Sequence, residues 1–208
     1  MKEYIFKNHE LKRTTTEFGR TYMSPNGIPL VSVTTALGVI NKPALMIWSA
    51  SQERNHVSSA ALNLFPDVSG GKITSMAQYR EALKDALGGK FAYLKTLKDA
   101  GQTGTNIHNA LEWKIKKQLG FDVGEQPLLS EQELIAYISF ESWMETVHFK
   151  PIAAELAVYS ETHQYAGTLD LIAMIDGHLT IVDYKSSKKL YVDHFLQASA
   201  YVEATREL

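Results

Sequence analysis

The 208-residue sequence contains no cysteine. This absence excludes disulfides, cysteine–zinc sites, thiol catalysis and iron–sulfur clusters. Long apolar runs are also missing: the first twenty residues contain no secretion-signal core, and no segment approaches the length of a membrane span. A Walker A motif for nucleoside triphosphates does not occur either. We therefore expect a soluble, intracellular and cytoplasmic protein that has no membrane partner.

The net charge is only −2, but the charges are unevenly distributed along the chain. Residues 1–120 carry 16 Lys and Arg against 9 Asp and Glu, a balance of +7, whereas residues 121–208 carry 5 against 14, a balance of −9. A basic half next to an acidic half is typical of a polyanion-binding surface beside a metal site. Solvated helix faces of opposite sign would give the same distribution, so charge alone does not decide between the two.

The hydrophobic period changes from about 3.6 before Pro151 to about 2 after it, which predicts helices followed by strands. Strong start signals are Thr103 or Thr105 as the N-cap of one helix and the Ser130–Glu133 capping box of the next. The expected elements are a hairpin over 20–34, two short helices over 32–50 with a break at Asn41–Pro43, helices over 76–98 (weakened at Gly88-Gly89), 101–120 and from 130, strands over 152–161, 165–175 and 178–185, and a helix over 192–208. This order predicts a single α/β (α+β) domain, 1–208, with a small central mixed sheet flanked by helices, in which 1–100 form a mainly helical N-terminal part and 101–208 the core.

Charged residues interrupt the apolar pattern of the last two predicted strands, "GTLDLIAMIDGHLTIVDYKSSKK" (167–189). Asp176-Gly177 between them favours a two-residue type I′ turn, which would place Asp170 directly opposite Asp183. Residues opposed in this way share a face, with Cβ atoms roughly 5 Å apart. Because side chains alternate along a strand, Lys185 joins this face. Alternation puts four apolar or aromatic residues on the other face: Leu169, Leu171, Val182 and Tyr184. Both faces are largely apolar, so we expect central strands.

Two opposed carboxylates in an apolar hairpin are unfavourable because of their repulsion and their desolvation. One acid could be protonated, a lysine could bridge the two acids, or a hard cation could bind between them. A cation explains why two acids occupy the position, and an Asp–Asp–Lys salt-bridge cluster is the alternative. Glu155 in the preceding strand would join Asp170 if the turn centres on Thr162–His163, whereas slippage by one residue would turn it to the opposite face.

The acid in "GTLD" followed by "VDYK" resembles motifs II and III of the PD-(D/E)XK nuclease superfamily. Two flanking segments are similar to elements of its RecB-like exonuclease branch: "GTNIHNALE" (104–112) to the G-T-x-x-H-x-x-x-E helix, and "QASAY" (197–201) to the Q-x-x-x-Y helix. "KPALMIW" (42–48) also resembles an N-terminal segment of these enzymes, which include phage RecB-like exonucleases and mitochondrial genome maintenance exonucleases. The resemblance covers roughly residues 30–205 and is compatible with a phage-encoded protein.

The resemblance implies roles for nine residues. Asp170, Asp183, the Tyr184 backbone carbonyl and His108 would bind one or two Mg²⁺ or Mn²⁺ ions, and Lys185 would act with the two aspartates in catalysis. Glu112 would support His108 as a further acid, or simply be solvated, and Glu155 would be an additional acid or a structural polar residue. Gln197 and Tyr201 would contact the substrate backbone.

The implied activity is metal-dependent hydrolysis of DNA by an exonuclease acting on ends or single strands in recombination, repair or replication. The implied partners are DNA, as single strands or duplex ends, and a recombination or replication protein. A structure-specific or restriction-type endonuclease of the same superfamily is the nearest alternative. A catalytically silent nucleic-acid-binding scaffold is an alternative from a different class, although a scaffold has no need of buried, opposed carboxylates.

Overall fold

The structure is a computed structural model that describes residues 11–16, 19–40, 42–89, 91–187 and 189–207. The chain divides into two compact units, one of Met1–Ile40 with Thr103–Leu208 and one of Asn41–Gln102. The first forty residues thus group with the C-terminal part of the chain. Within the described ranges, no helix has both the length and the hydropathy needed to cross a bilayer.

The larger unit mixes helices and strands, which confirms the predicted α+β class at this coarse level. Its elements, in chain order, are β1 (Lys12–Thr16), β2 (Gly19–Met23), β3 (Pro29–Ser32), α1 (Val33–Leu37), the greater part of α5 (Ala92–Gln118), α6 (Glu131–Glu145), β4 (Phe149–Ser160), β5 (Tyr165–Ile175), β6 (His178–Val182) and α7 (Val192–Arg206). The predicted hairpin over 20–34 is present as β2 and β3, while β1 was not predicted.

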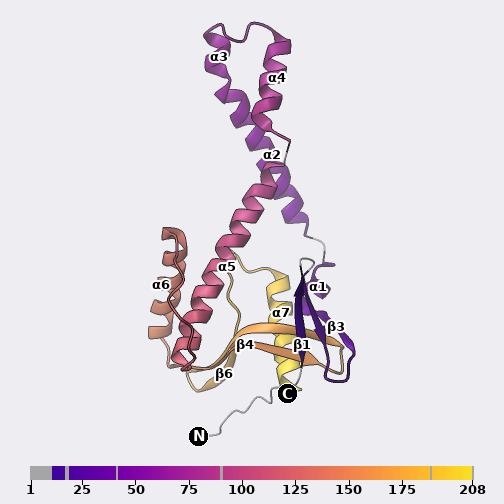
Figure 1. The fold of residues 1–208 in the computed structure, drawn as a ribbon, viewed down its shortest axis with the longest axis vertical. Helices are drawn as coiled ribbons and strands as arrows, with labels where there is room; N and C mark the ends of the chain where they lie inside the picture. Colours follow the sequence, from indigo (N-terminus) through magenta and orange to yellow (C-terminus); the bar gives the residue numbers. More distant parts are fainter. Residues whose placement is uncertain (1–10, 17–18, 41, 90, 188, 208) are drawn as a thin grey trace. The chain divides into compact units, whose positions relative to one another are not determined.

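The strands form one mixed sheet in the order β1-β2-β3-β5-β4, with β6 also paired to β5 (Figure 1). The β3–β5 pair is parallel, and the others are antiparallel. β5 is therefore the central strand, flanked by β4 on one edge and by β3 and β6 along the other. The sequence predicted two central strands, and this is confirmed for β5. It is wrong for β6, whose pairing among the described strands is with β5 and whose first residues are exposed.

The register of the β5–β6 hairpin is the predicted one. Asp176 and Gly177 have φ values of +49° and +82°, as a type I′ turn requires. The paired residues run from Ile175↔His178 to Leu171↔Val182, so the next position along brings Asp170 level with Asp183. β6 ends at Val182, earlier than the predicted residue 185, because the Tyr184 amide donates to the Asp170 carboxylate at 2.7 Å instead of continuing the ladder.

The alternation of side chains is interrupted at Asp170, which corrects one expectation. Leu169 and Leu171 should share a face, but Leu171 packs with Ile107 of α5 and Leu169 with Tyr201 of α7. The neighbouring strand is interrupted at the same level. Glu155 has a left-handed φ of +52° between the paired residues Ala154 and Leu156, and these two pack into the different clusters of the two faces.

Two hydrophobic clusters cover the two faces of the sheet around this point. α5 and α6 pack on Leu171, Ala173 and Tyr184, and α1 and α7 pack on Val158, Leu169 and Ile172. Burial of these apolar side chains is the main source of stability, at roughly 25 cal/mol per Å². The polar residues at the end of the hairpin are therefore held between two packed helical layers.

Two predicted helix boundaries are wrong. The helix expected to begin at Thr103 or Thr105 is the second part of α5, which starts at Ala92 and continues through Gly101 and Gly104. Glycine inside a helix costs only about 1 kcal/mol, which packing of the buried residues farther along α5 can offset. The helix after Pro43 is also longer than predicted, and Asn41, part of the expected break, lies outside the described residues.

The smaller unit is helical. It consists of α2 (Pro43–Asn63), α3 (Phe65–Ser69), α4 (Met76–Leu87) and the first residues of α5. α4 begins with a Ser75–Gln78 capping box and ends at Leu87, before Gly88-Gly89, where the sequence predicted a weakened helix that continues to residue 98. Glu53 of α2 accepts a hydrogen bond from the Tyr93 amide at 3.1 Å and so ties α2 to the start of α5.

Two glycine-to-alanine substitutions, with opposite expected effects on stability, test the packing around these glycines. A Cβ on Gly167 would lie 2.5 Å from the Tyr201 ring, so Gly167→Ala should destabilise the protein by about 1–3 kcal/mol. A Cβ on Gly101 meets nothing within 4 Å, so Gly101→Ala should stabilise its helix by about 1 kcal/mol. Thermal unfolding followed by circular dichroism measures both, and equal effects would contradict the packing described.

Candidate functional site

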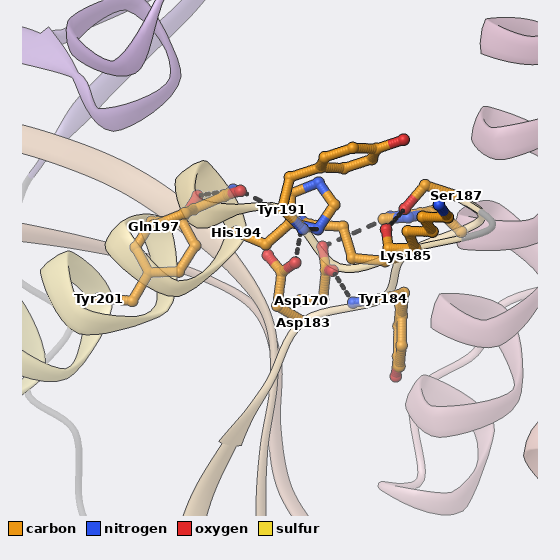
Figure 2. Close-up of polar contacts among 11 residues, drawn as sticks. Asp170, Asp183, Tyr184, Lys185, Ser187, Tyr191, His194, Gln197 and Tyr201 are labelled. Atoms are coloured by element: carbon orange, nitrogen blue, oxygen red, sulfur yellow. Dashed lines mark hydrogen bonds and ion pairs between the residues drawn. The ribbon is translucent and has the colours of Figure 1, made fainter. Parts of the chain in front are cut away.

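Side chains from four elements meet at the end of the β5–β6 hairpin. α5 contributes His108, β5 contributes Asp170, the segment after β6 contributes Asp183 and Lys185, and α7 contributes Gln197. Figure 2 shows the Asp170 and Asp183 carboxylates next to each other and directed to the same side of their strands. The predicted opposition of these two acids is therefore present in the structure.

Asp170 is held from two directions. Its Oδ2 accepts the Tyr184 amide at 2.7 Å, and its Oδ1 lies 3.6 Å from Nδ1 of His108. The Asp170 side chain is only 12% exposed, so these neighbours replace water in solvating it. The sequence motif that contains His108 thus does bring its imidazole to the acid pair.

Asp183 is paired with Lys185, and this lysine is fixed from α7. The Lys185 ammonium donates to Oδ2 of Asp183 and, at 3.1 Å, to Oε1 of Gln197. The other end of the Gln197 amide donates to the Tyr201 hydroxyl at 3.1 Å (Figure 2). Tyr201 is only 3% exposed and packs over Gly167. The two residues expected to contact substrate therefore form a chain that ends on Lys185.

The titration of these groups reflects crowded negative charge. Burial alone would lower the pKa of His108, but its interaction with Asp170 and the nearby charge of Asp183 outweigh burial, so the pKa is raised. Burial and the charge of Asp170 raise the pKa of Asp183, against the opposing effect of Lys185. Both shifts favour binding of positive charge, either as protons or as a cation.

Glu155 lies level with Asp170 on β4, because the β4–β5 turn has the predicted register. Burial and the charges of Glu112 and Asp170 raise the pKa of Glu155. Its carboxylate is 3.6 Å from Nη1 of Arg13, which also donates to the Thr168 hydroxyl at 3.2 Å. The carboxylate thus belongs to the acidic cluster and is partly balanced by arginine.

Arg13, together with Arg20, was missed by sequence reasoning. Both lie on the β1–β2 hairpin, and both charges lower the pKa of Glu155, opposing the larger effects that raise it. The sequence places Arg13 more than 140 residues before Glu155, in a segment with no helical or strand period strong enough to predict β1. The threonine-rich run at 14–16 was the available signal, since threonine favours strands.

Glu112 and the Tyr184 side chain have partners other than the two aspartates. The Glu112 carboxylate forms an ion pair with Lys116, four residues later on α5. The Tyr184 ring points away from the carboxylates and lies edge-on to the His108 ring, 5.6 Å between centroids. Burial raises the pKa of Tyr184 far above its usual range.

The donor set fits a hard divalent cation in its chemistry. Two adjacent carboxylates, an imidazole and a backbone carbonyl are ligands that Mg²⁺ or Mn²⁺ accepts. Burial, together with the charge of Asp170, raises the pKa of Asp183 and so disfavours its charged form. Among the described residues, however, no three His, Asp or Glu side chains are placed as ligands of one ion. Asp183 is paired with Lys185, and Asp170 lies 3.6 Å from His108.

A scan against protein-family models gives no match, and no curated protein has a significantly similar sequence. Functional interpretation therefore rests on the geometry of the site. Its components are two adjacent carboxylates, one fixed ammonium group, one imidazole and a nearby acid that is paired with Arg13. Such an arrangement can bind a cation and a polyanion at the same place.

The His108 titration can be measured directly. In metal-free buffer, the NMR titration of the imidazole should give a pKa above its ordinary value of about 6.5, and Asp170→Asn should lower it because the attraction is lost. Since the folded state holds this proton more tightly, its contribution to stability is present below about pH 6.5 and is lost as the pH rises through the folded pKa. A His108 pKa that Asp170→Asn leaves unchanged would contradict the contact.

Proposed function

We propose that this chain is a Mg²⁺- or Mn²⁺-dependent deoxyribonuclease of the RecB-like PD-(D/E)XK type, an exonuclease that hydrolyses DNA at ends or on single strands. The observation that carries the proposal is the placement of Asp170 beside Asp183, with Lys185 fixed next to them. In the sequence these three residues match the acid and the D-x-K of that family's motifs. Recombination, repair or replication is the context in which such an activity is used.

The metal would be held by the Asp170 and Asp183 carboxylates, the His108 imidazole and the Tyr184 backbone carbonyl. A bound divalent ion polarises a phosphodiester and lowers the pKa of the attacking water. The chain prepares the carboxylates for this task by holding them on a rigid hairpin. The Tyr184 amide fixes the rotamer of Asp170. The His108 imidazole limits where the other oxygen of the Asp170 carboxylate, Oδ1, points.

Lys185 supplies the positive charge of the chain itself. The Lys185 side chain is 22% exposed, and its ammonium donates to one carboxylate and to one amide oxygen. In phosphodiester hydrolysis, negative charge increases on the non-bridging oxygens as water attacks. A fixed ammonium beside that position stabilises this charge more than a solvated lysine would, since it needs little reorganisation.

The substrate is a polyanion, so the two arginines whose charges act on Glu155 are relevant to its binding. Arg13 and Arg20 lie on β1 and β2, close to the acid that neighbours Asp170. They offer phosphate contacts that would position DNA without reading its sequence. The excess of basic residues among the first 120 positions also favours a polyanionic partner.

A restriction-type or structure-specific endonuclease uses the same chemistry, and a scaffold uses none of it. Cleavage of closed circular DNA would favour the endonuclease. Tight, metal-independent binding without cleavage would favour the scaffold. Release of mononucleotides from labelled ends, with circles left intact, is the result expected for the exonuclease.

The central test is digestion of end-labelled single- and double-stranded DNA with Mg²⁺ or Mn²⁺. Asp170→Asn, Asp183→Asn and Lys185→Met should each reduce the rate roughly 10²–10³-fold or more, because each removes charge from the site. Lys150→Met on β4 serves as the matched lysine control and should leave the rate unchanged. Full activity in Asp183→Asn or Lys185→Met would overturn the site assignment, provided that circular dichroism shows all variants folded.

Gln197 offers a sharper test, because geometry and resemblance assign it different roles. If it positions Lys185, Gln197→Ala should lower kcat about tenfold with little change in KM, since the loss occurs mainly in the transition state. If it instead binds the DNA backbone, KM should rise while kcat is retained. Tyr201→Phe keeps the packed ring and removes only the hydroxyl, so it should have the same but smaller effect.

A further inference from the structure

A cavity of about 290 Å³ adjoins the acid pair on the side of α5 and α6. The same residues that form the site also line it, since Asp183, Tyr184 and Lys185 belong to its wall. The cavity lies entirely within the larger unit. Its volume is at the small end of the range for ligand pockets and suits one ring system rather than an extended ligand.

The wall of this cavity has two chemically different parts. Aromatic rings of Phe140 and Trp143 from α6 lie 5.4 Å apart, and the Tyr184 ring lies 5.2 Å from Phe140. His108 completes the ring cluster at 5.6 Å from Tyr184. The other part carries the charged groups of the site. A ligand that fills the cavity would place a flat apolar portion among rings and an anionic portion beside the Lys185 ammonium.

We propose that this cavity binds the base of the terminal nucleotide of a single-stranded DNA end. The inference rests on the proposed function and specifies its substrate. A nucleotide joins a flat aromatic base to a phosphate, and the cavity joins an aromatic wall to the charged site. Only an unpaired base can leave its stack and enter, so the cavity selects single-stranded or frayed ends over intact duplex.

The first experiment compares single-stranded oligonucleotides that end in a normal or an abasic nucleotide, tested at each end. The abasic end should be cut about 5- to 150-fold more slowly, because base–aromatic stacking is lost. Ala136→Leu fills the cavity from α6 and should remove the difference between the two substrates. Ile135→Leu, at the exposed neighbouring residue, is the matched control and should preserve it. Equal cutting of both ends by the unaltered protein would overturn the proposal.

The second experiment needs neither metal nor cleavage. Titration with dAMP should quench the tryptophan fluorescence of the unaltered protein, and Trp143→Phe should remove that quenching. Deoxyribose 5-phosphate should bind at least fivefold more weakly than dAMP. Binding of dAMP by Ala136→Leu with unchanged affinity would overturn the proposal, as would equal binding of the sugar phosphate.

The two proposals fail in different ways. If dAMP binds as described and no DNA is cleaved, the base site stands and the nuclease function fails. If DNA is cleaved at the same rate with and without the terminal base, the nuclease function stands and the base site fails. Circular dichroism of Ala136→Leu ensures that a loss of binding is not a loss of folding.

Discussion

Two carboxylates at the end of a hairpin are the constraint around which the larger unit is organised. Asp170 and Asp183 cannot move apart, because the β5–β6 ladder ends one residue before them and the Asp176-Gly177 turn fixes its register. Their repulsion must therefore be balanced locally. α5 brings an imidazole to one acid, and Lys185, held from α7, pairs with the other. The helices are thus needed for charge balance as well as for packing.

Turn and capping residues were sufficient to predict the part of the site that is formed by residues close together in the sequence. The Asp-Gly turn determines which residues face each other over a span of fourteen positions, and the Ser130–Glu133 box determines where α6 begins. Both are interactions between near neighbours, for which residue type alone limits the geometry. The predicted strands, register and final helix were therefore close to those in the structure.

The remaining features depend on contacts between distant segments. Gly104 was read as part of a helix start, but it lies inside α5, where its missing Cβ allows Ser186 to approach. Likewise Gly167 leaves room for Tyr201, and Arg13 reaches Glu155 from a strand that was not expected. Such packing cannot be read from a period or a capping residue, because it depends on which surfaces meet in the folded chain.

The left-handed backbone of Glu155 has a consequence for how this chain can change over time. A residue with a side chain is strained by about 1–3 kcal/mol in that conformation, and glycine would relieve most of the strain. Glycine would also remove the carboxylate that stands level with Asp170. At this one position, selection for a more stable fold and selection for an intact acidic cluster act in opposite directions.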